Sequence, residues 1–362
     1  MENRTPLWWA KAACDTMMRK FDAPSLPPKG HFHYHQGVFL SGMTETWKLC
    51  GEKKYFDYMK AWLDSVFDEK GAIINYSRGE LDDIMPGILL FPALDETGDP
   101  HYRDCIASVY RQYEDIPRTA EGGWWHKPHA EDQMWLDGLY MAGPFAAEYA
   151  RRFSRPDMTA DVIREALLMR EKCRDEKTGL MYHAWDGTKK SPWADPVTGR
   201  APEFWGRAMG WVPVALLNDL DFIPEGFEGR GEIEEMCADL LKALCAFQGG
   251  DGRWYQVVDK GGRGDNWPEN SCSCLYTAGL FKAMRKGILP GNYEKQAMRG
   301  YEGVINSLKF EGEDLMIGNV CIGTGVGDYA FYIARPCSVN DLHAVGAFLI
   351  MCTEAQRFLN EK

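Results

Sequence analysis

Hydrophobic positions recur with a period near 3.6 residues along most of the chain, which predicts amphipathic α-helices. The pattern divides into twelve helical segments, and turns such as "CGEKK", "TGDPH", "SRPD" and "LPGN" separate several of them. The predicted helices span residues 6–20, 35–50, 53–68, 83–97, 100–114, 131–153, 157–173, 204–219, 230–248, 269–286, 292–308 and 338–357.

The longer connections between these helices resemble one another. Each begins near a glycine, passes through an aromatic or β-branched run and ends in a polar cluster, as in "GAIINYSRGELDD", "GGWWHKPHAEDQ" and "DGRWYQVVDK". A helix–strand–helix unit that repeats roughly every 50 to 60 residues predicts stacked helical hairpins. We therefore expect an all-α fold, an (α/α)6 barrel with short β-hairpin loops at one end, as a single domain over residues 1–362. Two separate helical domains are the alternative, which the lack of a linker disfavours.

The even-numbered segments are predicted to form the inner ring. Segments such as "DGLYMAGPFAAEYA" and "DLHAVGAFLIMCTE" are apolar on nearly all sides, whereas the odd-numbered "PDMTADVIREALLMREKC" carries a charged face. The polar clusters then gather at the N-terminal ends of the inner helices. Helix N-termini favour negative charge, so this end is expected to form a funnel that accepts an anionic ligand.

Asp137, in "EDQMWLDGLYM", is the candidate general acid. It lies well inside the predicted helix 131–153, too deep to cap it, among apolar neighbours. Burial of a carboxylate in such surroundings is expected to raise its pKa, as a general acid requires. Glu131 and Asp132 are interpreted as ordinary acids at the helix end.

Other polar residues of the funnel are candidates for substrate binding. Arg207 lies between Trp205 and Trp211 in "WGRAMGW", where a planar cation could hold a carboxylate or bridge helix ends in the core. One of the pair Asp82 and Asp83 is expected to cap its helix. The remaining candidates are Tyr34, His35, His126, Lys127, His183 and His343, of which His343 is expected to be a core histidine.

Composition excludes several kinds of partner. The net charge of −12 disfavours nucleic acid and anionic membranes. The 13% of aromatic residues fits either a sugar-binding cleft or a large core. The 11 cysteines are scattered, and Cys272 with Cys274 is a weak metal signal. Without a signal peptide or an apolar run of membrane-spanning length, a reduced cytoplasmic protein is expected. The sequence gives no sign of the oligomeric state.

The motifs "WHK", "MWLDGLYM", "YHAWD", "FWGRAMGW" and "NDLHAVGAFL" resemble glycoside hydrolase family 105, the unsaturated rhamnogalacturonyl hydrolases, over nearly the whole chain. The resemblance implies an (α/α)6 barrel. It also implies release of a terminal 4,5-unsaturated uronic acid from oligosaccharides made by polysaccharide lyases. In that reaction an acid protonates C4 of the vinyl ether and water adds at C5. Neither a metal nor another cofactor is implied.

Carried over to this sequence, the resemblance makes Asp137 the general acid and base and Asp82 a second carboxylate that helps to hold the sugar or the water. His126 and His183 match residues that contact the substrate. Ring-stacking and anion-binding positions correspond to Trp205, Arg207 and Trp211. Tyr34 and Lys127 are added as substrate-binding residues because they open the same funnel.

Several alternatives stay open. An unsaturated glucuronyl hydrolase would act on other lyase products, of glycosaminoglycan, ulvan or arabinogalactan type. A sugar 2-epimerase would use a pair of histidines among His35, His183 and His343 as acid and base. A sugar-binding protein without activity would keep Trp205 and Trp211 but would not need Asp137. The sugar next to the uronic acid is not determined by the sequence.

Overall fold

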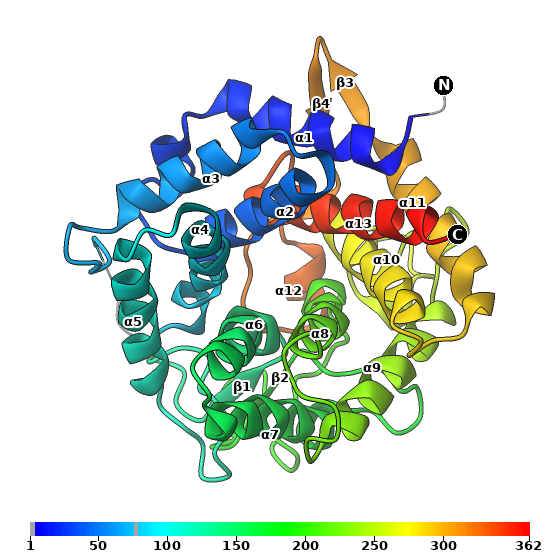
Figure 1. The fold of residues 1–362 in the computed structure, drawn as a ribbon. Helices are drawn as coiled ribbons and strands as arrows, with labels where there is room; N and C mark the ends of the chain where they lie inside the picture. The colour runs from blue at the N-terminus through cyan, green and yellow to red at the C-terminus, as the bar shows by residue number, and fades with distance from the viewer. Residues whose placement is uncertain (1–3, 76–78) are drawn as a thin grey trace.

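The computed structural model describes residues 4–75 and 79–362, which form a closed double ring of helices viewed along its axis in Figure 1. The inner ring consists of α2 (Tyr34–Cys50), α4 (Leu90–Thr97), α6 (Asp137–Arg152), α8 (Gly206–Asp219), α10 (Asn270–Arg285) and α13 (Leu342–Asn360). The outer ring consists of α1 (Pro6–Lys20), α3 (Lys53–Val66), α5 (His101–Glu114), α7 (Pro156–Cys173), α9 (Arg230–Cys245) and α11 (Glu294–Ser307). The predicted (α/α)6 barrel is confirmed.

Inner and outer helices differ as their sequences predicted. Helices α8 and α10 are buried along almost their whole length, whereas α3 and α11 bury one face only. The ring closes where α13 packs between α2 and α10 (Figure 1). Gly346 of α13 lies against the backbone of Val38 in α2, so closely that a Cβ atom there would collide with the Val38 carbonyl group. Small residues therefore let the inner helices approach one another.

Short antiparallel strand pairs connect the helices. β1 (Gln133–Trp135) pairs with β2 (Ala184–Asp186), and β5 (Val320–Cys321) pairs with β6 (Cys337–Ser338). A third pair, β3 (Lys309–Glu311) with β4 (Asp314–Met316), is a hairpin that projects beside α1 in Figure 1. The short helix α12 (Tyr329–Ile333) lies between β5 and β6 in the chain, near the centre of the ring in this view.

The predicted helix 131–153 is wrong at its start. Asp132 has a φ of 56°, and residues 133–135 form β1, so that α6 begins only at Asp137. The pairing of β1 with β2 satisfies backbone groups that a helix would otherwise have used. Glu131 and Asp132 are therefore not acids of a helix end. Asp137 is the first residue of α6 rather than a residue in its middle.

Two further helices begin later than predicted. The predicted helix 83–97 opens with 3₁₀ turns, η2 (Leu81–Asp83) and η3 (Met85–Leu89), because Pro86 has no N–H to donate. Neither Asp82 nor Asp83 is an N-cap residue, so the capping interpretation is wrong. The last helix begins at Leu342, since β6 and Asn340, whose φ is 55°, precede it.

The remaining helix boundaries agree with the predictions to within a few residues. The connection "GAIINYSRGELDD" includes residues 76–78, which lie outside the described part of the chain. Among the described residues, no helix is both long enough and apolar enough to cross a membrane.

Candidate active site

A cavity of about 330 Å³ opens at the N-terminal ends of the inner helices. The start of α2, the η2 turn, the first residue of α6 and the first turn of α8 all reach it. The structure thus brings most of the predicted site residues together. His183 and His343 are fully buried and do not line the cavity, which agrees with the expectation that His343 is a core histidine. The predicted residues that line the cavity are Tyr34, His35, Asp82, His126, Lys127, Asp137, Trp205, Arg207 and Trp211.

Asp137 is bound by a chain of hydrogen bonds. Its Oδ2 lies 3.0 Å from Nε2 of His183, and Nδ1 of His183 lies 2.6 Å from the hydroxyl group of Tyr332. Burial raises the pKa of Tyr332 well above its ordinary value, so the phenol keeps its proton and donates it to Nδ1. His183 then carries its own proton on Nε2 and donates it to Asp137. The backbone N–H of Gly327 donates in turn to Tyr332.

This chain of hydrogen bonds contradicts the expectation that Asp137 has a raised pKa. Burial alone would raise the pKa of Asp137, but the hydrogen bond from His183 and the positive charge of Arg207 outweigh it. The pKa of Asp137 consequently lies below its ordinary value in the free protein. The side chain keeps 14% of its surface exposed, so it is open to the cavity.

Asp82 lies at the centre of a second polar cluster. Its carboxylate oxygens lie 3.5 Å from Nζ of Lys127 and 3.7 Å from Nε2 of His126. Burial would lower the pKa of Lys127, but the carboxylates of Asp82 and Glu80 raise it, so the amine is charged. Burial lowers the pKa of His126, which favours the neutral ring. The cluster therefore offers a carboxylate, a cation and a neutral imidazole to one side of the cavity.

Arg207 is buried beside the ring of Trp205, with its guanidinium carbon 4.5 Å from the ring centre. It donates from Nη1 to the carbonyl oxygen of Cys321 at 2.6 Å and from Nη2 to that of Ile322 at 2.9 Å. No carboxylate of the described residues forms an ion pair with it. Arg207 therefore enters the cavity wall without a direct ion-pair partner among the described residues. Burial would lower its pKa, but nearby groups that include Glu269 and Asp137 raise it.

Both tryptophans of "WGRAMGW" are covered by other aromatic rings. Trp205 stacks on Tyr332 with ring centres 5.6 Å apart, and Trp211 stacks on Tyr140 at 4.7 Å. Their exposed fractions are only 0% and 1%. The predicted stacking of a sugar on these two rings thus stays a prediction.

Sequence reasoning missed several residues of this site. Trp135 lines the cavity and stacks on His126 with ring centres 4.3 Å apart. Arg335 also lines the cavity, donates to the Gly323 carbonyl oxygen, and has a buried Nε without a hydrogen-bond partner among the described residues. Because no carboxylate in the described chain forms an ion pair with Arg335, this arginine is a second cation without an ion-pair partner. In the sequence, Arg335 could have been noticed as the basic residue of "YIARP", within the last long connection between predicted helices.

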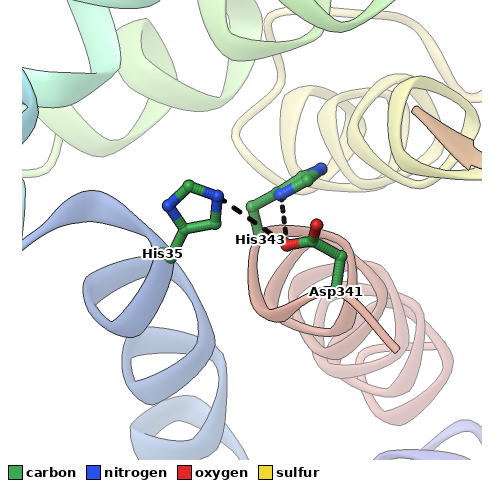
Figure 2. Close-up of side chains that lie close together, drawn as sticks. All are labelled: His35, Asp341 and His343. Carbon is green, nitrogen blue, oxygen red and sulfur yellow. Dashed lines mark ion pairs between the residues drawn. The ribbon is translucent and has the colours of Figure 1, made fainter. Parts of the chain in front are cut away.

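Two groups of side chains have the composition of a metal site. Figure 2 shows the first, in which ring nitrogens of His35 from α2 and His343 from α13 both approach one oxygen of the Asp341 carboxylate. Oδ1 of Asp341 lies 2.7 Å from Nδ1 of His343 and 3.8 Å from Nε2 of His35. The second group consists of His33, Glu80 and Asp82. Imidazole and carboxylate ligands suit zinc, but the resemblance implies no metal.

A larger cavity, of about 610 Å³, lies at the opposite, C-terminal ends of the inner helices. Its charged residues largely neutralise one another. Arg152 pairs with Asp95 at 2.6 Å and with Glu148 at 2.7 Å, and Lys282 pairs with Asp221 at 2.7 Å. Because its cations already have partners, the smaller cavity is the better candidate for an anionic ligand.

Comparison with known proteins supports a glycosidase. A family model described as "Glycosyl Hydrolase Family 88" matches residues 9–359. The solved family 105 glycoside hydrolase of C. acetobutylicum ATCC 824 has a TM-score of 0.92, at 31% identity over 96% of this chain and 99% of that one. "Protein Atu3128" of Agrobacterium fabrum is 28% identical over 59% of this chain and 98% of its own length.

A further relative, "Unsaturated rhamnogalacturonyl hydrolase YesR" of Bacillus subtilis, is 26% identical over 80% of this chain and 79% of its own. The family model spans nearly the whole sequence, and the solved enzyme superimposes on it almost from end to end. The chain therefore belongs to the glycoside hydrolases of families 88 and 105, and it is an enzyme.

Proposed function

We propose that this enzyme releases the terminal 4,5-unsaturated uronic acid from oligosaccharides made by polysaccharide lyases, with unsaturated galacturonyl-rhamnose as the substrate. The observation that carries the proposal is Asp137, which faces the cavity at the start of α6 with His183 and Tyr332 behind it. The name of the Bacillus subtilis relative supports the choice of rhamnogalacturonan fragments.

Asp137 is proposed to act as both acid and base. Its carboxyl group gives a proton to C4 of the vinyl ether, which leaves positive charge at C5 and the ring oxygen. The resulting carboxylate then takes a proton from a water molecule as the water oxygen bonds to C5. The hemiketal formed in this way opens and releases the neighbouring sugar. One carboxyl group suffices, in contrast to the pair of carboxyl groups in ordinary glycosidases.

Because the pKa of Asp137 is lowered in the free enzyme, the substrate has to help to protonate it. A uronate carboxylate brought into the same cavity disfavours a second negative charge nearby and raises the pKa of Asp137. It also displaces water, which strengthens this repulsion. Substrate binding would thus create the acid that the first step needs.

The two arginines without ion-pair partners are proposed to hold the uronate carboxylate. Arg207 supplies a fixed charge from inside the wall, and Arg335 supplies a charge from the connection between α12 and β6. Guanidinium groups bind carboxylates in a planar, directed manner, which also orients the sugar ring. Lys127 is less suited to this role because Asp82 already lies 3.5 Å from its amine.

The decisive experiment compares Asp137→Asn with the wild type on an unsaturated galacturonyl-rhamnose disaccharide. We expect the variant to fold and bind the disaccharide while kcat falls by about 10³-fold or more, because the amide cannot donate the proton. Loss of the ultraviolet absorbance of the alkene measures turnover, and calorimetric titration measures binding. Asp132→Asn is the matched control, since Asn tolerates the positive φ at this position and its side chain does not line the cavity.

Wild-type turnover by Asp137→Asn would contradict the proposed role of the residue. A panel of lyase-generated disaccharides tests the substrate. Preference for an unsaturated glucuronyl glycosaminoglycan or ulvan fragment would replace the rhamnogalacturonan assignment while leaving the reaction unchanged. Cleavage of saturated galacturonides would instead indicate ordinary glycoside hydrolysis.

A further inference from the structure

Two cysteines face each other across the strand pair β5–β6. Cys321 and Cys337 are direct partners in the antiparallel register. The N–H of Ile322 donates to the carbonyl oxygen of Pro336 at 3.2 Å, so the neighbouring position is a hydrogen-bonded pair. Hydrogen-bonded and non-hydrogen-bonded pairs alternate along such a ladder, which makes Cys321 and Cys337 a non-hydrogen-bonded pair.

Non-hydrogen-bonded partners are the closest residues of an antiparallel ladder. Their Cα atoms are about 4.5 Å apart and their side chains leave the same face. Disulfides join Cα atoms that are about 4.4 to 6.8 Å apart, so the two backbones need no rearrangement before a bond can form. Both thiols are free in the structure.

We propose that Cys321 and Cys337 form a reversible disulfide that closes the segment between them into a covalent loop. The two thiols differ in access: Cys337 is exposed, whereas Cys321 is buried. A reagent from solution would therefore react with Cys337, and Cys321 would complete the bond from inside.

Oxidised glutathione is an oxidant of the right class. The Cys337 thiolate attacks one sulfur of the glutathione disulfide, which forms a mixed disulfide and releases one glutathione thiolate. The Cys321 thiolate then attacks Sγ of Cys337 and releases the second glutathione. Two protein thiols lose two electrons and two protons in total, and one glutathione disulfide becomes two glutathione thiols.

The reaction should be slow at neutral pH. Burial raises the pKa of both thiols above the ordinary value, so the attacking thiolates are scarce. Below these pKa values, the thiolate concentration rises about tenfold for each unit of pH. The cross-link is consequently expected to form much faster in alkaline solution.

The loop that the disulfide would close is part of the cavity wall. It contains Thr324 and Arg335, which line the cavity, and Tyr332, which bonds to His183. To reach Cys337, Sγ of Cys321 gives up the hydrogen bond from Nε2 of Gln256 at 3.0 Å, and this amide keeps its bond to the Tyr332 carbonyl oxygen at 3.1 Å. The cross-link would thus restrain the wall. This inference does not depend on the proposed substrate.

The test treats the reduced full-length protein with oxidised glutathione at pH 7 and at pH 9, followed by non-reducing peptide mapping by mass spectrometry. We expect a peptide that links Cys321 to Cys337, formed faster at pH 9 and removed by dithiothreitol. Cys337→Ser should abolish this peptide. Cys245→Ser, which removes a partly buried thiol elsewhere in the chain, should leave it unchanged.

Limited proteolysis supplies a second measurement. Cleavage within residues 322–336 should be several-fold slower in the oxidised protein than in the reduced one. The proposal is overturned if Cys337 ends as a glutathione mixed disulfide while Cys321 stays free. It is equally overturned if Cys337 links two chains, or if neither thiol is oxidised at pH 9.

Discussion

Asp137 receives its hydrogen bond at the end of a chain of donors that begins at the backbone of Gly327. Each link has one direction only, because the Tyr332 phenol keeps its proton and the tautomer of His183 follows from that donation. The carboxylate is therefore held in place and in its charged form until a substrate arrives. We therefore expect His183 to position and tune Asp137 as the proposed acid. That His183 also contacts the substrate stays a prediction.

Replacement of His183 should change the pH dependence of catalysis. In His183→Ala the donor to Asp137 is lost, which raises the pKa of Asp137, and the protonated acid persists to higher pH. A hydrogen bond of this kind is worth about 1.4 kcal/mol, which corresponds to roughly one pH unit. We therefore expect the alkaline limb of the kcat/KM profile to move upward by about one unit, although the maximum rate falls.

His183→Gln serves as the comparison, since its amide can still donate to Asp137 and should shift the limb less. The measurement is kcat/KM for the unsaturated disaccharide as a function of pH. An alkaline limb at the same pH in the wild type and in His183→Ala would show that this hydrogen bond does not set the acidity of Asp137.

The sequence pointed to Asp137 as a candidate, but it did not predict the surroundings of this residue. A carboxylate in an apolar stretch is visible in one short window, whereas its partners His183 and Tyr332 come from connections far away in the chain. Local sequence could therefore not reveal that the carboxylate has a donor, and the expected rise in its pKa was wrong. Trp135 was missed for a related reason, since its ring was assigned to a helix core.

Among the secondary-structure elements, the prediction fails where a few residues of a predicted helix form a strand instead. Residues 133–135 fit both a helical and a strand pattern, because three residues are too few to distinguish the two periods. Pairing with β2, which comes from a distant part of the chain, determines that these residues form a strand. The long apolar helices were predictable, since their pattern extends over several turns and their burial does not depend on one partner.

The contact between α2 and α13 requires a glycine. A methyl group at position 346 would meet the Val38 carbonyl group, and both atoms belong to rigid helices. Gly346→Ala should therefore lower the free energy of unfolding by about 1 to 3 kcal/mol through overpacking. Denaturant titration measures this loss.

Gly231→Ala is the matched control for this prediction. It lies in the first turn of α9 with open space around it, so the added methyl group should leave stability unchanged or raise it by about 0.5 to 1 kcal/mol. Equal stability of Gly346→Ala and the wild type would mean that the two helices can separate at little cost.

Glu165 of α7 joins the outer ring to the connection before α6. Its buried Oε2 accepts a hydrogen bond from the N–H of Trp124 at 2.8 Å, and burial raises the pKa of this carboxyl group to about 8. A raised pKa in the folded state stabilises the fold at low pH, and this contribution is lost as the pH rises from the ordinary value of 4.5 through about 8.

Glu165→Gln keeps an acceptor for Trp124 but cannot ionise. Within the pH window from 4.5 to about 8, the wild type should lose up to roughly 1.4 kcal/mol per pH unit that the variant retains. Melting temperatures measured at pH 5, 7 and 9 should therefore diverge in favour of the variant as the pH rises. Parallel curves would indicate that Glu165 is already ionised in the fold.

Over the whole molecule, the local charge at the candidate site differs from the negative net charge of the chain. The chain carries −12, yet Arg207 and Arg335 face the cavity without carboxylate partners in the described residues, while the cations of the opposite cavity are paired. Net charge disfavours nucleic acid as a partner, but it carries no information on where the unpaired cations lie. That location depends on which helix ends meet in the ring.

That residues 1–362 form a single domain stays a prediction. The closed ring of helices supports an experiment that tests it. Around the ring, α2 packs against α13, α13 against α10, α10 against α8 and α8 against α6, while η3 bridges α6 and α2. Because α1 at the start of the chain also packs against α13 at its end, removing any hairpin opens the ring. We therefore expect a single calorimetric unfolding transition, and we expect deletion of residues 342–362 to abolish folding rather than leave a folded remainder. Two separated transitions, or a stable fragment that resists protease and ends before α13, would mean that part of the barrel folds independently.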